Sequence, residues 1–241
     1  MGRKAEEEAK GAKAALVAEL KAHGAILGGF VGLLWVIHLV NAVVFGGKLA
    51  AFGVAPRSLS GLWGILFAPF LHGNLQHLIA NTAPLLILGW FVMLRRKRDL
   101  LYVSALSALV GGLGTWLIAP SASVHIGASV LVFGYLGHLL SRGIFERRFW
   151  PILGSLAVFL LYGGALFGIF PGEVGISWQG HLFGLVGGVL AARFLSAKPE
   201  GAPPAPKKRV AASLPSAARA EVPADDDHED ELAEMKRRLG R

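Results

Sequence analysis

Residues 25–47 read AILGGFVGLLWVIHLVNAVVFGG, a run without a single charged side chain. A helix of about 20 residues is long enough to cross the ~30 Å hydrocarbon core of a bilayer, so this run predicts a transmembrane helix. Because lipid offers no partner to exposed backbone groups and none of the apolar runs alternates with period two, helices are expected rather than a barrel. The sequence therefore predicts an all-α polytopic membrane protein, with a bundle of six transmembrane helices at roughly 25–47, 73–94, 100–119, 127–142, 149–169 and 177–196.

The composition of the whole chain agrees with this prediction and excludes several kinds of site. Of its 241 residues 54% are hydrophobic and 17% charged, with a mean hydropathy of +0.54, whereas soluble domains are about 25% charged. The formal net charge is +8, but the basic residues stand at the ends of apolar runs, so they indicate membrane topology and no binding of nucleic acid is expected. The absence of cysteine excludes disulfides, thiolate metal sites and cysteine nucleophiles.

Charge and composition also divide the chain into three parts. Residues 1–24 mix Lys and Glu on an Ala-rich stretch, which favours a short solvated or interfacial helix in a cytoplasmic N-terminal segment. Residues 25–196 hold the predicted bundle, and 197–241, rich in Pro and charged residues, are expected to form a disordered cytoplasmic tail. Basic clusters at 95–98 and 142–148 lie in alternate loops, so the positive-inside rule places both termini in the cytoplasm.

Polar side chains inside the predicted spans are few, and each is a candidate functional residue because it is costly in lipid. Asn81, Ser129 and His181 precede the basic residue at the inner end of their spans by 14, 13 and 12 positions. At about 1.5 Å per residue, all three are expected roughly 18–21 Å above the inner boundary, near the outer face of the membrane. His77 lies one turn before Asn81 and shares its helical face. The sequence thus predicts a polar site shared by three helices.

Ser129 begins the predicted fourth span, in the sequence Gly127-Ala128-Ser129. The first residues of a helix have free N–H groups and lie at the positive end of its dipole, which suits an oxyanion. A serine needs a base to become a nucleophile, and His181 is a histidine at the same expected depth. Because no Asp or Glu lies at that level, we predict a catalytic dyad of Ser129 and His181 rather than a triad.

Other residues are expected to support this pair or to have structural roles. Phe133, one turn after Ser129, is placed to stack on the imidazole. Gly184 and Gly188 share a face with His181 and allow two helix backbones to approach closely. Three further polar positions have no predicted part in the chemistry: His38 with Asn41, and His138, are expected to be structural, whereas His125 in an outer loop fits either reading.

These motifs resemble those of the rhomboid family of intramembrane serine proteases. The stretch His72-Gly-Asn-Leu-Gln-His77-Leu-Ile-Ala-Asn81 is similar to the family's second-span pattern of two histidines five apart and an asparagine four further on. Gly127-Ala128-Ser129 resembles the nucleophile motif of its fourth span. His181-Leu-Phe-Gly184 with Gly188 resembles its sixth-span histidine motif. The resemblance covers roughly residues 25–196.

The resemblance implies a serine endopeptidase that cuts transmembrane helices near the outer membrane face. Ser129 would attack the scissile carbonyl, and His181 would take its proton and return it to the leaving amine. The side chains of His77 and Asn81, with the Ser129 N–H, would form the oxyanion hole. The fifth span and the loop around 170–176 would control sideways access of the substrate.

The same resemblance sets the expected partners and surroundings. Transmembrane protein substrates and membrane lipid are the implied partners, with no metal or cofactor, while the oligomeric state is left open. His72 would help to order the mouth of the site. A bacterial plasma membrane is the expected location.

Two departures from the family pattern and three rival readings accompany this interpretation. Val130 stands where the family usually has glycine, and Trp63 lacks the adjacent arginine of the family's Trp-Arg feature in the first outer loop. The main alternative is a catalytically inactive relative that binds transmembrane helices without cleaving them. A metal-dependent peptidase is disfavoured because the chain lacks His-Glu-x-x-His, and a transporter because no charge pairs lie at the midplane.

Overall fold

The computed structural model describes residues 2–172 and 175–196, and most of them are helical. The longer helices are α1 (Gly2–Val43), α3 (Leu75–Met93), α4 (Lys97–Ile118), α5 (Ser129–Glu146), α6 (Phe149–Tyr162) and α7 (Trp178–Leu195). The connections contain the short helices η1 (Lys48–Phe52), η2 (Ser60–Trp63), α2 (Gly64–Phe67) and η3 (Ala68–Phe70), and η4 (Gly163–Ile169) extends α6. In these described residues the one extended pairing is a single bridge between Val54 and His125. The all-α prediction is confirmed.

Four of the helices in the described part of the chain are long and apolar enough to cross a membrane: α1 from Ala9 onward, α3, α4, and α6 together with η4. This number is smaller than the six spans predicted. The remaining two apolar runs are the helices α5 and α7, which have 18 residues each and carry many of the chain's buried glycines and polar side chains. Because α5 and α7 face protein on most sides, they do not need the uniformly apolar surface that lipid demands.

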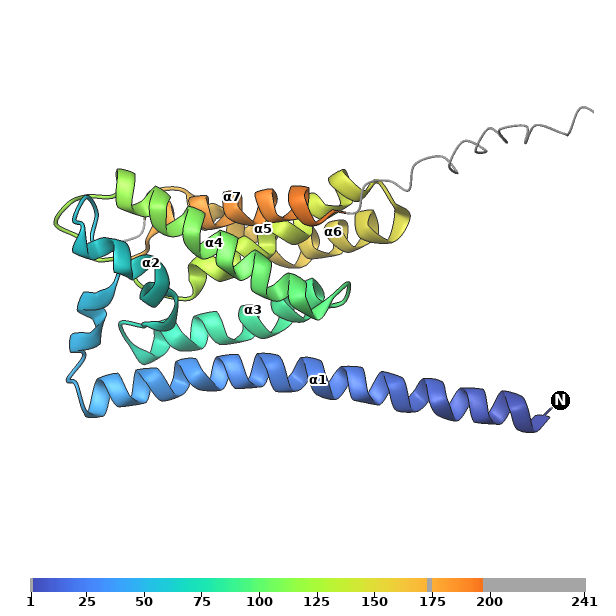
Figure 1. Ribbon diagram of the computed structural model, residues 1–241. Coiled ribbons are helices and arrows are strands. Elements are labelled where there is room, and N and C mark those ends of the chain that lie inside the picture. The colour runs from blue at the N-terminus through green and yellow to red at the C-terminus, as the bar shows by residue number, and fades with distance from the viewer. Residues whose placement is uncertain (1, 173–174, 197–241) are drawn as a thin grey trace, which may run out of the picture. The chain divides into compact units, whose positions relative to one another are not determined.

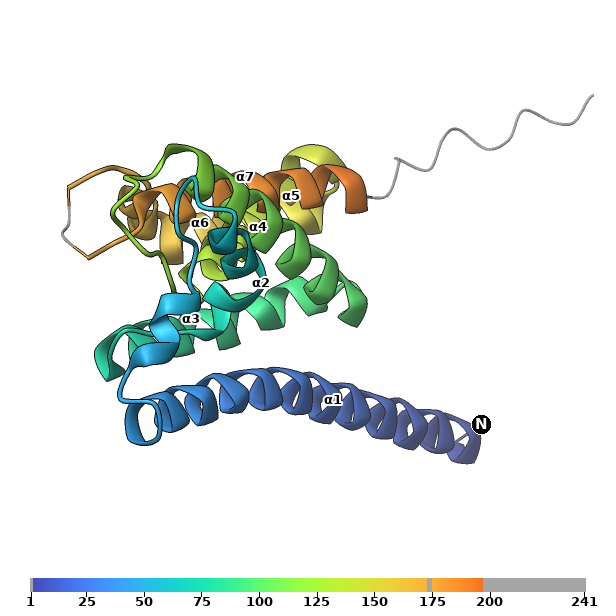
Figure 2. The same ribbon diagram turned by 60° about the vertical axis from the view of Figure 1, so that its left-hand side comes forward.

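The N-terminal helix α1 is a single unbroken helix of 42 residues. The short helix and the first span predicted from the sequence are therefore joined. Figures 1 and 2 show α1 lying along α3, with its N-terminal part running on beyond the bundle. The indole N–H of Trp35 donates to the Thr82 hydroxyl at 3.2 Å, which ties α1 to α3. The predicted tail, 197–241, lies outside the described residues.

The central helix of the bundle is α5, which packs against α3, α4, α6 and α7 (Figure 1). Its contact with α7 is made through glycines: a Cβ built on Gly184 would lie 2.4 Å from the Val130 carbonyl oxygen. On the other side of α7, a Cβ on Gly187 would lie 2.8 Å from the Leu106 carbonyl of α4. Small residues at both contacts allow the three backbones to touch, which is how helices associate in lipid.

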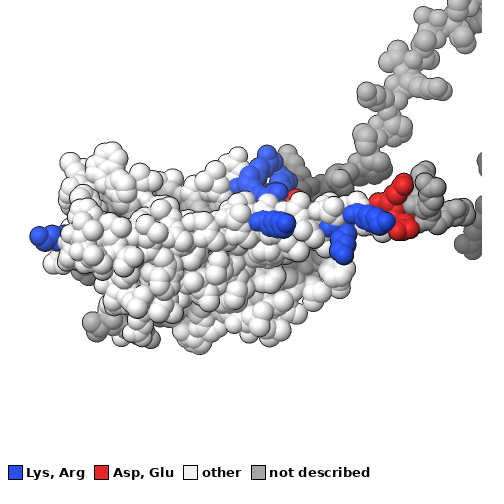
Figure 3. Space-filling view, turned by 90° about the horizontal axis from the view of Figure 1, so that it is seen from below, with Lys and Arg blue, Asp and Glu red and all other residues white. Residues whose placement is uncertain are grey.

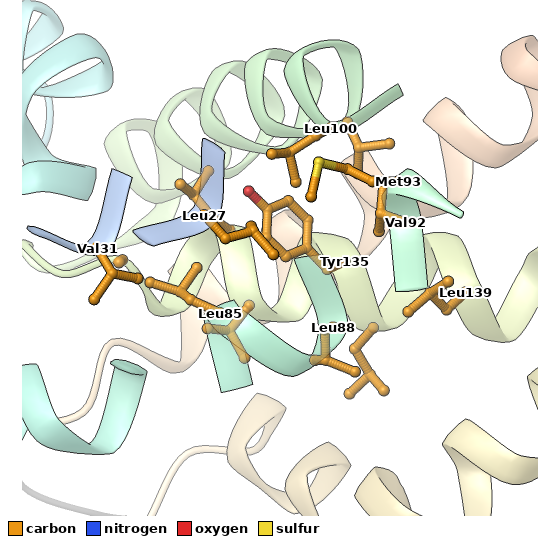
Figure 4. Close-up of a cluster of buried hydrophobic side chains, with 14 of the residues drawn as sticks. Leu27, Val31, Leu85, Leu88, Val92, Met93, Leu100, Tyr135 and Leu139 are labelled. Atoms are coloured by element: carbon orange, nitrogen blue, oxygen red, sulfur yellow. The ribbon is translucent and has the colours of Figure 1, made fainter. Parts of the chain in front are cut away.

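A cluster of buried apolar side chains joins α1, α3, α4 and α5 (Figure 4). Leu85, Leu88 and Val92 of α3 are fully buried against it. Tyr135 of α5 lies in the middle of the cluster, and its hydroxyl is satisfied by the Ser104 hydroxyl at 2.7 Å. Because this cluster fixes α3 against α5, it also fixes the positions of the polar residues on those helices.

On the face shown in Figure 3, most of the Lys and Arg side chains lie toward one end, and a wide uncharged surface separates them from a basic group at the other end. At the basic end, Glu146 of α5 accepts from Arg142 at 2.7 Å and lies 3.4 Å from Arg95. Arg95 also donates to the Leu195 carbonyl at the end of α7, and Lys97 pairs with Glu19 of α1 at 2.9 Å. Charge at the ends with an apolar belt between them is the surface expected of a protein in a bilayer.

Candidate active site

A hollow of about 560 Å³ opens between α3, α5, η4 and the start of α7. Its walls include His77 and Asn81 of α3, Ser129 and Phe133 of α5, and His181 of α7. These residues come from three helices that are far apart in the sequence. The structure thus brings the predicted dyad and the predicted oxyanion-hole residues to one cavity.

The turn before Ser129 needs glycine at position 127. Gly127 has φ +122°, a conformation that L side chains rarely adopt. A Cβ built there would lie 2.6 Å from His77 Nε2 and 3.7 Å from Ser129 Oγ. The glycine therefore leaves the space in which the His77 ring and the serine hydroxyl approach one another. Its own N–H donates to the Ala68 carbonyl at 2.9 Å, which anchors the turn.

His72 supports the same turn from within the protein. It is 1% exposed, and its Nε2 accepts from the Ala128 N–H at 3.4 Å. Its ring packs edge-on against His77, with 5.1 Å between the centroids. His72 thus holds both the residue before the serine and the ring beside it. These contacts support the turn that precedes Ser129.

The imidazole of His181 is fixed on two sides. Phe133 stacks on its face, with 4.1 Å between ring centroids and 11° between planes. Its Nδ1 lies 2.9 Å from the Gly168 carbonyl oxygen. Because a carbonyl only accepts, Nδ1 carries the hydrogen and Nε2 has a free lone pair. A neutral imidazole in this tautomer has its basic nitrogen available for the chemistry.

Asn81 and His77 are linked through the backbone of α3. The side-chain N–H of Asn81 donates to the His77 carbonyl at 2.9 Å, and Asn81 is only 4% exposed. Asn74 caps this helix by accepting from the His77 N–H at 2.8 Å. The Asn81 amide has a second N–H, which this hydrogen bond does not use.

Ser129 and His181 border the hollow without bonding to each other: within residues 2–172 and 175–196, no hydrogen bond joins Ser129 Oγ to the ring of His181. Hydrogen bonds of this kind are often long in an empty site and shorten when substrate binds. The structure thus places both groups on one cavity.

Val130, the first departure from the family pattern, points away from the hollow toward α4 and α7. A Cβ built on Gly111 of α4 would lie 2.2 Å from Val130 Cγ2, and one on Gly184 would lie 3.1 Å from it. Val130 also lines a small cavity of about 30 Å³ behind Ser129. The valine therefore occupies space that the glycines on the two neighbouring helices provide.

A chain of hydrogen bonds on the far side of Ser129 was not predicted from the sequence. His125 contacts the Ser123 hydroxyl through Nε2 at 2.8 Å and the Ser177 hydroxyl through Nδ1 at 2.7 Å. Ser177 caps α7 by accepting from the Gly180 N–H at 3.3 Å. Burial lowers the pKa of His125 below its ordinary value. In the structure His125 makes structural contacts, because it joins the connection between α4 and α5 to Ser177 at the start of the helix that carries His181.

The connection that follows α1 is anchored by an arginine that the sequence reading did not single out. Arg57 donates to the Leu117 carbonyl at 3.0 Å and to the Ser121 hydroxyl at 2.5 Å. The indole N–H of Trp116 donates back to the Ser58 carbonyl at 2.8 Å. Trp63, by contrast, is 67% exposed. Arg57 and Trp116 thus fix this connection to the end of α4.

Comparison with known proteins decides the family. Residues 59–198 match the family model of the rhomboid domain. The chain belongs to the rhomboid family. An uncharacterized protein of Mycobacterium tuberculosis is 46% identical over 176 residues, which cover 70% of this chain and 73% of the relative.

Two relatives of this rhomboid have names that state an activity. Rhomboid protease GluP of Bacillus subtilis is 33% identical over 160 residues, or 64% of this chain and 31% of GluP. Rhomboid-like protease 5 of Toxoplasma gondii is 29% identical over 141 residues, or 56% of this chain and 16% of the relative. No solved structure matches this rhomboid significantly.

Proposed function

We propose that this rhomboid is an intramembrane serine endopeptidase that uses Ser129 as nucleophile and His181 as base. The observation that carries the proposal is the hollow shared by the two side chains, with the Nε2 of His181 free to accept a proton. Membership of a family with relatives named as proteases supports the reaction class. The names of GluP and of the Toxoplasma relative support only the reaction class. The proposed chemistry rests on the residues of this chain.

In the proposed reaction, Ser129 Oγ attacks the carbonyl carbon of the scissile peptide bond while His181 Nε2 takes its proton. The tetrahedral intermediate collapses when His181 returns that proton to the leaving amine, which yields an acyl-enzyme and a free amino terminus. Water, deprotonated by the same nitrogen, then attacks the ester carbonyl. The bond to Ser129 Oγ breaks, His181 returns the proton to that oxygen, and a carboxyl terminus is released. The Gly168 carbonyl and the Phe133 face keep the imidazole in position through both steps.

The negative charge of the tetrahedral intermediate needs donors around it. The N–H of Ser129 is at the first turn of α5, where it has no partner within the helix, and the helix dipole favours an anion there. The His77 ring lies beside Gly127, and the free N–H of Asn81 belongs to a residue of the same wall. We assign these three groups to the oxyanion hole, where losing one donor typically costs about 10²–10³ in kcat.

We propose that substrates are transmembrane helices that reach the hollow between α3 and α6. The hollow that holds Ser129 and His181 is bordered by Ala80 and Pro84 of α3 and by Ala165 of η4, the continuation of α6. A second hollow of about 260 Å³ lies between α3 and α6 at the basic end of the molecule, where Phe91, Arg95 and Trp150 line it. Most of α6 is exposed, and Val158 is its one buried residue. A helix with so few internal contacts is the element that can move aside at the lowest cost.

The proposed placement in the membrane follows from the charges. In this proposal α5 and α7 cross the bilayer inside a ring formed by the other helices, which gives six spans. The basic end of the molecule faces the cytoplasm together with both termini, so the hollow opens toward the outer face. We propose a bacterial plasma membrane, in keeping with the bacterial relatives.

The test is cleavage by the purified full-length protein in detergent, with a single-span transmembrane helix as substrate and a fluorophosphonate as an independent probe of an activated serine. We expect the wild type to cleave and to be labelled. Ser129→Ala and His181→Ala are both expected to lose at least about 10³-fold in kcat. Added chelator is expected to have no effect.

Matched variants separate loss of chemistry from loss of fold. Ser141→Ala removes a buried hydroxyl from the same helix as Ser129, where it donates to the Gly137 carbonyl at 2.6 Å. His138→Gln removes a buried imidazole from that helix. Both are expected to keep activity. Labelling of Ser129→Ala would overturn the assignment, and a folded wild type that is neither labelled nor active would favour the inactive, helix-binding relative.

A further inference from the structure

The Gly168 carbonyl contacts the imidazole of His181, a side chain that belongs to another helix. Gly168 lies in η4, and its oxygen is 2.9 Å from His181 Nδ1. The ring of His181 is 9% exposed and is stacked on Phe133. The single hydrogen of the neutral imidazole is therefore held by a main-chain acceptor that belongs to another element.

This hydrogen bond is similar to the one that a carboxylate accepts from the histidine of a catalytic triad. There the acceptor fixes the tautomer and the orientation of the ring, and it stabilises the positive charge that forms when the ring takes a proton. A carbonyl oxygen carries only a partial negative charge, so it orients the ring in the same way but stabilises the positive charge more weakly. Among residues 2–172 and 175–196 no Asp or Glu borders the hollow, and the Gly168 carbonyl is the acceptor that contacts His181 Nδ1.

The position of this carbonyl depends on α6. Helix η4 continues α6 directly after Tyr162, and it packs on α7. Its Ala165 borders the hollow that contains Ser129, and α6 borders the second hollow toward α3. Whatever displaces α6 and η4 also displaces the acceptor of the His181 hydrogen.

We propose that Gly168 is a positioning residue: its carbonyl keeps the hydrogen of His181 on Nδ1 and the Nε2 of His181 directed to Ser129, so that the base is ready only when η4, which continues α6, lies against α7. The inference rests on the proposed peptidase function and adds the group that orients its base. Movement of α6 would then remove the acceptor of the His181 hydrogen. A substrate helix that opens the gap between α3 and α6 must let η4 return before the serine is activated.

The test uses two glycines of the same short helix. A methyl group on Gly168 would press on Phe133 Cζ at 3.0 Å and on His181 Nδ1 at 3.2 Å, whereas a methyl group on Gly164 would meet nothing within 4 Å. We expect Gly168→Ala to lower the rate of fluorophosphonate labelling and kcat by at least about tenfold, since small displacements of a catalytic group are costly. KM for the transmembrane substrate is expected to stay within about twofold. Gly164→Ala is expected to match the wild type in labelling rate, kcat and KM.

A second variant weakens the acceptor without adding any bulk. Replacing Ile169 by its α-hydroxy acid turns the Gly168 carbonyl into an ester carbonyl, which is a poorer acceptor, and the same change at Phe167 is the control. We expect the ester after Gly168 to slow labelling about fivefold and the control to leave it unchanged. Equal labelling of both esters would overturn the inference even if Ser129→Ala abolishes labelling and so upholds the peptidase. A wild type that is not labelled would overturn both.

Discussion

The carbonyl oxygen of Gly134 lies so close to Gly188 that a Cβ built on Gly188 would be 1.8 Å from it. α5 and α7 therefore touch backbone to backbone about one and a half to two turns below Ser129 and His181. Ser129 lies near the start of α5 and His181 near the start of α7, so the distance between them is set by this contact. A small change at Gly188 is expected to reach the site through the two helices.

Gly188→Ala is predicted to destabilise the protein by about 3 kcal/mol, because the added methyl overpacks a backbone contact that has no flexible side chain to move. The measurement is thermal unfolding in detergent micelles. Gly154→Ala on α6 is the control, since a methyl group there meets nothing within 4 Å. In an open helical position alanine is favoured over glycine by up to about 1 kcal/mol, so this variant is expected to be neutral or slightly more stable. Equal unfolding temperatures for the two variants would contradict the packing.

Gly127→Ala is predicted to lose about 10²-fold or more in labelling rate and kcat. Alanine at φ +122° is strained, and its methyl group would lie 2.6 Å from the His77 ring. Gly73→Ala is the matched control in the neighbouring connection, where the nearest atom would be Ile126 Cδ1 at 3.9 Å. A Gly127→Ala variant as active as Gly73→Ala would show that this turn does not position Ser129.

Val130→Ala is predicted to change the choice of cleavage site more than the rate. Val130 lines the cavity of about 30 Å³ behind Ser129, so a smaller side chain at this position enlarges the space beside the nucleophile. We expect bulkier residues to be accepted next to the scissile bond, and a loss of stability of about 2 kcal/mol for the cavity left behind. Mass spectrometry of products from a set of substrate helices that differ at that residue measures the first effect. Val103→Ala, buried on α4, should cost similar stability and leave the product pattern unaltered.

The stability of the protein is predicted to fall in acid partly through His125. Because burial lowers the pKa of His125 from its ordinary 6.5, the unfolded chain binds a proton at a higher pH than the folded chain does. The free energy of unfolding therefore decreases as the pH falls below about 6.5 and is unaffected by this group above it, with a slope of at most about 1.4 kcal/mol per pH unit.

Unfolding temperatures measured from pH 8 to pH 5 test this prediction. His125→Gln keeps a polar side chain but removes the titration, so its curve is expected to fall less steeply in acid than that of the wild type. Parallel curves for the two proteins would rule out His125 as a source of the acid sensitivity.

Much of the fold and the choice of candidate residues followed from local patterns in the sequence. Apolar runs long enough for the bilayer predicted the helices, because lipid forces every backbone group to bond within its own segment. The same reasoning made the polar residues Ser129, His181, His77 and Asn81 conspicuous, since each is costly within such a run. Their common level followed from the fixed rise of a helix. These are properties of single helices, and they need no knowledge of neighbours.

The contacts between helices required the tertiary structure. The sequence did not show that α1 continues unbroken through residue 24, nor which faces of α5 and α7 are buried against the other helices. It left open whether His125 is structural or functional. It also gave no sign of the contact made by the Gly168 carbonyl, because every residue has a carbonyl and only packing decides where each one points. The sequence alone thus determined which side chains are available for chemistry near one face of a membrane. The packing of η4 and α7 decided which nitrogen of His181 is free, because that depends on an acceptor 13 residues away in the chain and 2.9 Å away in space.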